Sequence, residues 1–242
     1  MKRPLIALMA ALAVTLHAAD HPQWGGLNSR NMVSDEKGLP VEMDPGKKFG
    51  PKAAPKAAGR LRPDAQEANS APGAEDVDMS TTKNCLWVAK LGSQTYGSPI
   101  IADGRVYIGT NNESPRNGKH VGDRGIVMCF DEKTGKFLWQ LVSPKMGTGK
   151  VNDWEYLGIC GSPTIVGKVG YVPGNRCQII AFDVEGMANG NQGMTDEAQF
   201  MAAPGPDGKP VAVEPGPTDC DILWVYDMYK ELGVFQRNAT SG

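Results

Sequence analysis

The sequence predicts an all-β protein made of repeated four-stranded antiparallel units. Three observations support this: an excess of glycine and proline, short β-rich runs between turn signals, and landmarks that recur at one spacing. The 30 glycines and 18 prolines among 242 residues favour many short strands over a helical bundle. Trp87 and Trp139 lie 52 residues apart, and so do Asp131 and Asp183. A recurring spacing of this size is the signature of a repeat architecture.

The first 19 residues have the features of a secretory signal peptide. Lys2 and Arg3 precede an apolar run at 5–16, and two small residues follow it, Ala18 and Ala19. The run is too short for a comfortable membrane span, so an anchoring helix is the less favoured alternative. We therefore expect export to the periplasm or the cell exterior, with no membrane span after cleavage.

The first repeat contains four strand signals in about 50 residues. The first two runs flank Asp103-Gly104, a dipeptide typical of tight hairpins, and Gly135 supplies the turn between the last two. Four short antiparallel strands of this kind make one blade of a β-propeller. The predicted strands are residues 100–102, 106–108, 126–130 and 137–142.

A second unit repeats the order of the first. Gly161-Ser162-Pro163 repeats Gly97-Ser98-Pro99, and a third pass opens at Trp224. A blade cannot bury both faces alone, so neighbouring blades must stack around an axis. A propeller has four to eight blades, and this sequence supplies about two. We therefore expect an incomplete propeller, the amino-terminal part of a longer protein.

Residues 129–139 resemble the tryptophan-docking motif of quinoprotein propellers, the PQQ-like repeat family. The family motif reads A-x-D-x-x-T-G-K-x-x-W, and this chain has C-F-D-E-K-T-G-K-F-L-W. The segment H-P-Q-W-G-G at 21–26 is similar to the amino-terminal signature of exported bacterial members. The resemblance covers residues 21–40 and 84–242, although 181–183 keep only the first third of the motif. It implies a tryptophan that packs between blades, with structural docking positions at Asp131, Thr134, Gly135 and Trp139.

Two segments interrupt the repeats. The first is rich in proline, alanine, lysine and glycine and has few residues that build a core, which predicts a disordered linker. The second is rich in glycine, asparagine and proline, and loops of its length are usually functional or disordered. The predicted organisation is a signal peptide (1–19), an N-terminal segment (20–43), the linker (44–83) and a partial propeller (84–242) with an insertion (184–221).

The loops at one end of the blades form the candidate binding surface, which we call the rim. In a propeller, loops joining the second and third strands of a blade share a face with loops between blades, which places 111–124 and 143–160 together. Function concentrates on loops of a rigid scaffold, so we expect a protein partner or small ligand here. A solvated loop face is the alternative for any single residue. The candidates are Asn111, Asn112, Arg116, His120, Arg124, Asp153, Trp154, Glu155, Tyr156, Asn175 and Arg176.

The start of the insertion offers several oxygen ligands at close spacing. Calcium favours oxygen-rich loops flexed by glycine, but the order of residues does not fit an EF-hand. An Asx-rich turn is the alternative. The candidate metal ligands are Asp183, Glu185, Asn189 and Asn191, and we expect the insertion on the face opposite the rim.

Five cysteines follow the signal peptide, an odd number that leaves at least one outside any internal disulfide. Cys160 and Cys177 flank a predicted hairpin and are the best candidate pair, with two buried thiols as an equally good alternative. The absence of CxxC, with only three histidines, gives no support for zinc or c-type haem.

Composition and motifs leave two hypotheses for function. The net charge of −2 gives no basic face for nucleic acid, and no nucleophile elbow, phosphate loop or HExxH occurs, so we assign no catalytic residue. We favour an exported, non-catalytic binding or scaffold module, a role that several members of the resembled family have. The alternative is an oxidoreductase dependent on PQQ and calcium, an alcohol or sugar dehydrogenase. Such family members commonly carry a disulfide between adjacent cysteines, which this sequence lacks.

Overall fold

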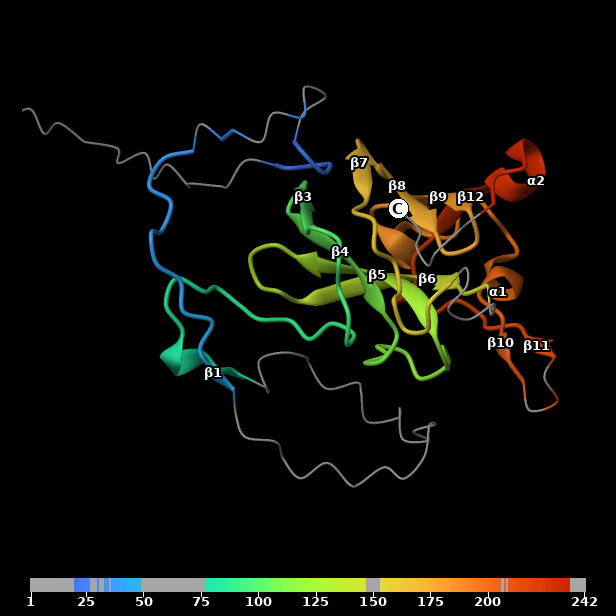
Figure 1. The fold of residues 1–242 in the computed structure, drawn as a ribbon, viewed down its shortest axis with the longest axis horizontal. Helices are drawn as coiled ribbons and strands as arrows, with labels where there is room; N and C mark the ends of the chain where they lie inside the picture. The colour runs from blue at the N-terminus through green and yellow to red at the C-terminus, as the bar shows by residue number, and fades with distance from the viewer. Residues whose placement is uncertain are drawn as a thin grey trace, which may run out of the picture.

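Two four-stranded antiparallel sheets form the core of the protein (Figure 1). The first has the strand order β3-β4-β5-β6 and the second has the order β7-β8-β9-β12. The all-β class predicted from the sequence is therefore confirmed. The predicted signal peptide lies outside the described residues. The computed structural model describes residues 20–26, 30, 33–34, 36–48, 77–146, 153–205, 207 and 209–235.

The first sheet contains all four strands predicted for the first repeat. Asp103 and Gly104 join its first hairpin with φ of 49° and 72°, the positive pair that a tight hairpin turn needs. The register places Ile100 opposite Tyr107. Three of the strands are longer than predicted, because polar residues at their ends continue the ladder. The strands are β3 (Ile100–Ala102), β4 (Arg105–Asn111), β5 (Arg124–Asp131) and β6 (Phe137–Pro144).

The second sheet repeats this order, but its fourth strand follows the insertion. β12 pairs antiparallel with β9, with Trp224 opposite Ala181, so the chain returns to the same sheet after residues 184–221. A short helix, α2 (Met228–Leu232), follows β12 directly. The other strands are β7 (Thr164–Val166), β8 (Val169–Gly174), β9 (Gln178–Asp183) and β12 (Ile222–Asp227).

The two sheets pack face to face through aromatic side chains. The ring of Trp139, on β6, lies 5.9 Å from Tyr107 and 5.5 Å from Phe182 between ring centroids. All three rings are buried, and each ring removes about 150–250 Å² from water. At about 25 cal/mol per Å², this contact contributes several kcal/mol per ring before the cost of ordering it. Trp139 therefore packs between the two sheets.

The Gly-Ser-Pro repeats also contact one another directly. The amide of Ser98 donates to the hydroxyl of Ser162 at 2.9 Å, and that hydroxyl donates back to the Ser98 carbonyl at 2.9 Å. The two serines are 64 residues apart, and each precedes the first strand of its sheet. The motif therefore joins the sheets next to their first strands, β3 and β7.

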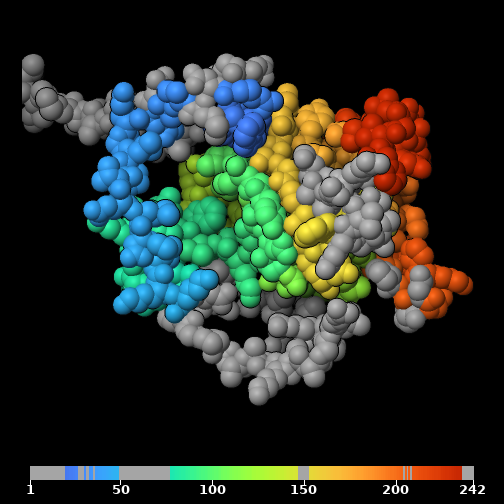
Figure 2. Space-filling view, in the orientation of Figure 1, coloured from blue at the N-terminus to red at the C-terminus, as the bar shows by residue number. Residues whose placement is uncertain are grey.

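The segment after the predicted cleavage site bonds to the edge strands β3 and β7 of both sheets. His21 exchanges backbone hydrogen bonds with Ile101 on β3, at 2.7 and 3.2 Å, and the carbonyl of Pro22 accepts from Ile165 on β7 at 2.7 Å. Figure 2 shows this segment, in dark blue, lying against the surface of the sheets. Residues 21–22 thus tie one sheet to the other.

Both ends of the predicted linker are ordered, which corrects its boundaries. β1 (Lys47–Lys48) pairs antiparallel with β2 (Val77–Asp78), and Asp44 forms a bridge with Lys83. A 3₁₀ turn (Met79–Thr81) follows β2. Composition alone missed this ladder because one buried apolar residue, Val77, anchors it. Residues 49–76 of the predicted linker lie outside the described residues.

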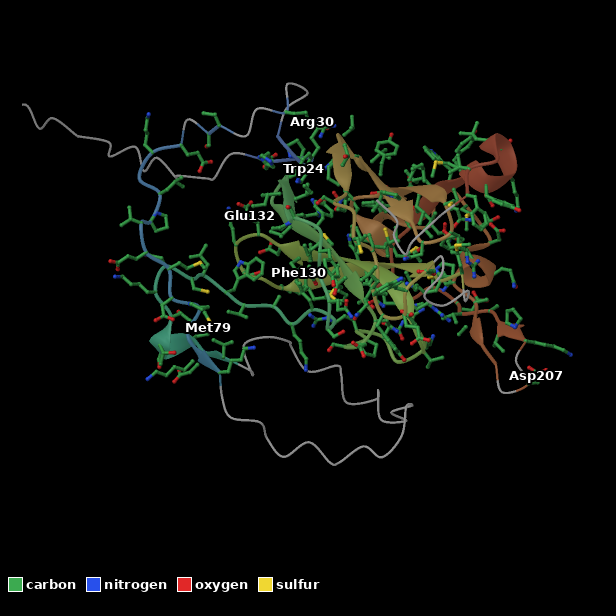
Figure 3. The ribbon with its side chains drawn as sticks, viewed as in Figure 1. Trp24, Arg30, Met79, Phe130, Glu132 and Asp207 are labelled. Carbon is green, nitrogen blue, oxygen red and sulfur yellow. The ribbon has the colours of Figure 1, made fainter. Side chains whose placement is uncertain are left out.

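The insertion covers the outer face of the first sheet. Met201, Ala203 and Val213 are buried in one cluster with Ile126 and Met128 of β5. Figure 3 labels Phe130, from the same layer, and Asp207, which lies at the far end of the insertion. The described elements are a 3₁₀ turn (Gly186–Asn189), α1 (Glu197–Phe200), β10 (Ala203–Pro204) and β11 (Pro210–Val211).

The end of the insertion runs beside β6. Thr218 accepts from the Gln140 amide at 3.0 Å, and Cys220 donates to the Gln140 carbonyl at 2.8 Å. The insertion is therefore a packed cover and an added edge of the first sheet. In the described part of the chain, no helix is long and apolar enough to cross a membrane.

Candidate functional site

The loops of the rim meet at one end of the two sheets. The side chain of Asn111, at the end of β4, donates to the carbonyl of Tyr156, and Asn175, after β8, donates to the carbonyl of Gly158 at 2.9 Å. The loop before β7 is therefore held from both sheets. The structure brings residues 111–124, 153–160 and 175–176 together.

Asn111 and Asn175 hold the rim in shape. They lie 64 residues apart, the spacing of the serine pair, and both are completely buried. Asn111 also accepts from the amides of Ser93 and Glu113, each at 3.1 Å. Asn111 also donates to the Ser93 hydroxyl at 2.9 Å, whereas Oδ1 of Asn175 is buried without a hydrogen-bond partner among the described residues. Both side chains hold the loop before β7 through its backbone carbonyls.

The side chains of Asn112 and Arg116 are also buried and bond to other parts of the protein. The amide of Asn112 donates to the carbonyls of His120 and Gly122, which closes the loop on itself. The Arg116 guanidinium lies 5.0 Å from the Phe137 ring centroid and donates to the Lys90 carbonyl. Burial lowers the pKa of Arg116 to about 10. Arg116 therefore stabilises the layer under the insertion through a cation–π contact.

His120 forms a buried pair with an aspartate that the sequence did not single out. Its Nε2 lies 2.9 Å from Oδ1 of Asp219, and both side chains are fully buried. Asp219 also accepts from the Gly216 amide at 2.8 Å and from Asn117 at 3.3 Å. Burial alone raises the pKa of Asp219, but the hydrogen bond and charge of His120 bring it below its ordinary value.

This pair corrects one expectation about the insertion. Asp219 belongs to residues 184–221, which we expected on the face opposite the rim, and yet it contacts the rim residue His120. The physical reason is the run of 218–220 beside β6, which carries the end of the insertion across the sheet edge. No sequence pattern marks this path.

A charged cluster lies beside the loop before β7, which Asn111 and Asn175 hold. Lys145 forms an ion pair with buried Asp153 and donates to the Trp154 carbonyl at 2.8 Å. Arg176 donates to the Lys145 carbonyl at 3.2 Å. Burial, together with the charge of Arg176, lowers the pKa of Arg124, whose guanidinium donates to the Asp123 carbonyl at 2.9 Å. Lys145 and Asp123 fall in the predicted loops but were not among the candidates.

Three consecutive exposed candidates, Trp154, Glu155 and Tyr156, form a tip on the rim, and Arg176 is the other exposed candidate. Trp154 is 49% exposed and Tyr156 is 38% exposed, which is high for large aromatic side chains. Tyr156 has a φ of 60°, a conformation that costs a non-glycine residue about 1–2 kcal/mol. Its amide donates to Asp123 at 2.8 Å, and burial raises the pKa of Asp123. Hydrogen bonds on both sides of Tyr156 therefore hold the strained tip.

The predicted calcium ligands are occupied within the chain. Asp183 accepts from the Glu185 amide at 2.7 Å and from Asn189 at 3.0 Å. Glu185 is paired with Arg105 and, at 3.4 Å, with Lys168. Among the described residues, no group of three or more histidine, cysteine, aspartate or glutamate side chains is placed to hold a metal ion.

The docking positions form one turn and one contact between sheets. Asp131 accepts from the amide and hydroxyl of Thr134, at 2.8 and 2.6 Å, and these bonds lower the pKa of Asp131. Gly135 takes a φ of 69° beneath the ring of Trp87. In the structure these residues form the turn between β5 and β6 and the contact between the sheets.

The structure does not form the predicted disulfide between Cys160 and Cys177. Cys160 is a free thiol that donates to the carbonyl of Leu157 at 3.8 Å. Burial raises the pKa of this thiol, so it is a weak nucleophile near neutral pH.

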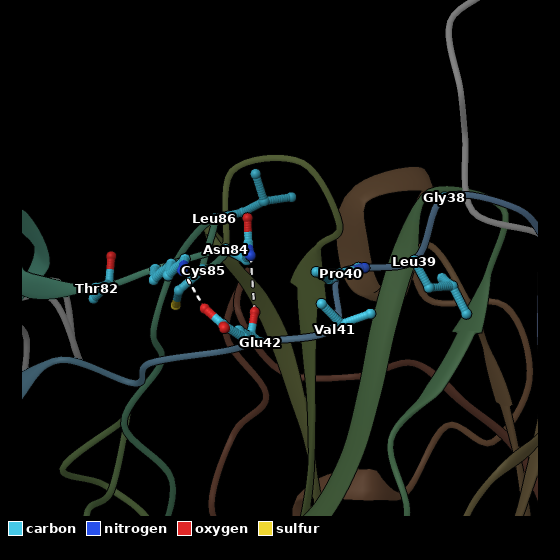
Figure 4. A pocket seen from close by; sticks show the side chains of 10 residues that line it. Gly38, Leu39, Pro40, Val41, Glu42, Thr82, Asn84, Cys85 and Leu86 are labelled. Carbon is cyan, nitrogen blue, oxygen red and sulfur yellow. Dashed lines mark hydrogen bonds and ion pairs between the residues drawn. The ribbon is translucent and has the colours of Figure 1, made fainter.

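A shallow depression lies away from the rim, between two extended segments (Figure 4). Residues 38–42 and 82–86 line it, and its volume is about 690 Å³. Asn84 donates to the Glu42 carbonyl at 2.8 Å across it. No predicted site residue lies there. No protein-family model matches the sequence, and no curated protein is significantly similar to it.

Proposed function

We propose that this chain is an exported, non-catalytic binding module of the PQQ-like propeller type, and that the rim contacts a protein partner. The observation that carries the proposal is the tip at residues 154–156, which hydrogen bonds fix in place. Trp154 and Tyr156 are exposed there, next to the buried ion pair of Lys145 and Asp153. Aromatic side chains of this kind supply much of the binding energy in protein interfaces.

The aromatic pairs of the two sheets support the propeller. Tyr107 and Trp139 lie 5.9 Å apart at 55° between the sheets, and Tyr171 and Trp224 lie 5.9 Å apart at 52° on the second sheet. Trp224 is 45% exposed. The second sheet therefore presents the contact with which the first sheet binds its neighbour. We infer that a further sheet of the same type stacks there.

The hydrogen bonds and ion pairs of the rim side chains favour a binding role over a catalytic one. Lys145, Asp153 and Arg176 bond to one another or to backbone carbonyls, and His120 is buried against Asp219. The rings of Trp154 and Tyr156, in contrast, are exposed, so they can cover an apolar surface while the indole N–H and the phenol hydroxyl bond at its edge. This arrangement suits recognition, in which exposed aromatic anchors are surrounded by polar groups.

Photo-crosslinking tests the proposed contact. A benzophenone amino acid at position 154 of the full chain should crosslink to one specific protein in the cells that produce it. The same probe at Val166, which is 62% exposed on β7, is the matched control and should give none of that product. Equal products at both positions would contradict a binding role for the rim.

A cofactor titration separates this proposal from the oxidoreductase. The full chain is mixed with PQQ and CaCl₂, and the PQQ absorbance and the reduction of a dye by alcohols and sugars are followed. We expect no saturable change. Saturable PQQ binding with dye reduction that depends on alcohol or sugar would replace the binding module with a dehydrogenase.

A further inference from the structure

Two carboxylates of the insertion are buried with one unused oxygen each. Glu197, on α1, is 1% exposed, and Asp221, directly before β12, is 0% exposed. Asn191 donates to Oε2 of Glu197 at 3.2 Å, and the Gln192 amide donates to Oδ2 of Asp221 at 3.0 Å. The other oxygens, Oε1 and Oδ1, are buried and have no hydrogen-bond partner among the described residues.

The hydrogen bonds place the two carboxylates beside each other. Their donors, Asn191 and Gln192, are adjacent in the chain, so one short stretch fixes one oxygen of each group. Burial and the neighbouring charges of Glu197 and Asp183 raise the pKa of Asp221. Because the two donors are neighbours in the chain, Glu197 and Asp221 lie near each other.

Two unpaired carboxylates in this position are costly. A buried ion costs several kcal/mol unless a counter-charge and hydrogen bonds compensate it. In the part of the chain that the structure describes, neither Glu197 nor Asp221 has an ion-pair partner. A cation that binds both free oxygens would remove this cost.

We propose that Glu197 and Asp221 form a binding site for a divalent cation, with calcium as the best fit. Calcium prefers carboxylate and amide oxygens and tolerates irregular geometry, whereas magnesium demands a strict octahedron. Asn191 is exposed, and turning its amide replaces the donor Nδ2 with the ligand Oδ1. Asn191 and Gln192 are both exposed, so waters from that side would complete the coordination. The inference does not depend on the proposed binding role of the rim.

The proposed site differs from the one predicted from the sequence. Only Asn191 belongs to both, because the oxygens of Asp183 and Glu185 already have partners. The new site joins α1, which leads into the cover over the first sheet, to Asp221, which leads into the second sheet. A bound cation would therefore hold the cover in place.

Thermal unfolding with and without calcium tests the site. The full chain is freed of metal with a chelating resin, and its Tm is measured at pH 7.5 with EGTA, CaCl₂ or MgCl₂. Calcium at a hundredfold excess over Kd should raise Tm by about 5 °C or more, and magnesium should raise it less. Glu197→Gln and Asp221→Asn should each abolish the shift. Asp207→Asn, an exposed carboxylate of the same insertion, is the matched control and should keep it.

Isothermal calorimetry with CaCl₂ supplies a second measurement, and its wild-type titration does not depend on a variant folding. One saturable site in the wild type, absent from Asp221→Asn, supports the proposal. A calcium shift that survives in both variants places the cation elsewhere and overturns it. The absence of any calcium effect, with a higher Tm for Glu197→Gln than for the wild type in EGTA, would show that the carboxylates share a proton instead.

Discussion

The indole Nε1 of Trp139 donates a 3.0 Å hydrogen bond to the carbonyl of Val184, 45 residues further along the chain. Trp87 donates in the same way to Glu132, also 45 residues on, at 2.7 Å. The two tryptophans are themselves 52 residues apart. The repeat in the sequence is therefore a repeat of contacts, in which each tryptophan bonds to the turn that follows the third strand after it, β5 for Trp87 and β9 for Trp139.

Replacing the buried Trp139 should cost much more stability than replacing the exposed Trp224. We expect Trp139→Ala to lower the free energy of unfolding by about 3–5 kcal/mol, because it leaves a cavity between the sheets and an unpaired Val184 carbonyl. Trp224→Ala, at a 45% exposed position, should cost less than about 1.5 kcal/mol. Urea unfolding of both variants measures the difference. Equal losses would show that Trp139 is not the anchor of the interface.

The strands of the first repeat were predictable because local signals agreed with the global fold. β-branched runs, an Asp-Gly turn and the repeat spacing all placed the same elements, and each appears within three residues of its expected end. The ladder of β1 and β2 was missed because two-residue strands have no periodicity to detect. Its position depends on burial of Val77, which only the folded chain defines.

The rim was predictable as a place, but the roles of its residues were not. The topology brings the loops together, and yet Asn111 and Asn175 bond to the backbone and Arg116 lies against Phe137. Asp219 was missed because the insertion has no pattern that fixes its path to His120. Residue type and spacing show which loops meet, whereas the direction of each side chain follows from packing.

The buried pair of His120 and Asp219 should make the free energy of unfolding fall at acidic pH. The pKa of Asp219 is below its ordinary value of 3.8, so the stabilisation is complete above that value and is lost as pH falls through the lower pKa of the folded state. Asp219→Asn should cost about 2–4 kcal/mol at pH 7. The difference between wild type and variant should shrink below pH 4, as measured by urea unfolding from pH 3 to 7. A constant difference across this range would assign the loss to packing alone.

The effects on stability of substitutions at Gly125 and Asn175 should be coupled. A Cβ at position 125 would overlap Oδ1 of Asn175 and lie 2.8 Å from Cγ1 of Ile159. We expect Gly125→Ala to cost about 1–3 kcal/mol, since the neighbours must move. The double variant Gly125→Ala/Asn175→Ala should lose less than the sum of the single losses, because the shorter side chain frees the space. Additive losses in a double-mutant cycle by chemical unfolding would mean that the two residues act independently.

The strain at Tyr156 should be relieved by a residue that accepts positive φ. Asparagine populates this conformation readily, so Tyr156→Asn should raise the free energy of unfolding by about 0.5–1 kcal/mol. The same variant should reduce the crosslink formed from position 154, because the ring that contacts the partner is gone. Tyr229→Asn, at a 56% exposed position of α2 with ordinary backbone and a ring contact to Phe235, is the control: it should leave the crosslink unchanged and should not raise the free energy of unfolding. If Tyr156→Asn is less stable than the wild type, the Tyr156 ring contributes to stability by packing. The positive φ at this position would then not be a strain that is retained for binding a partner.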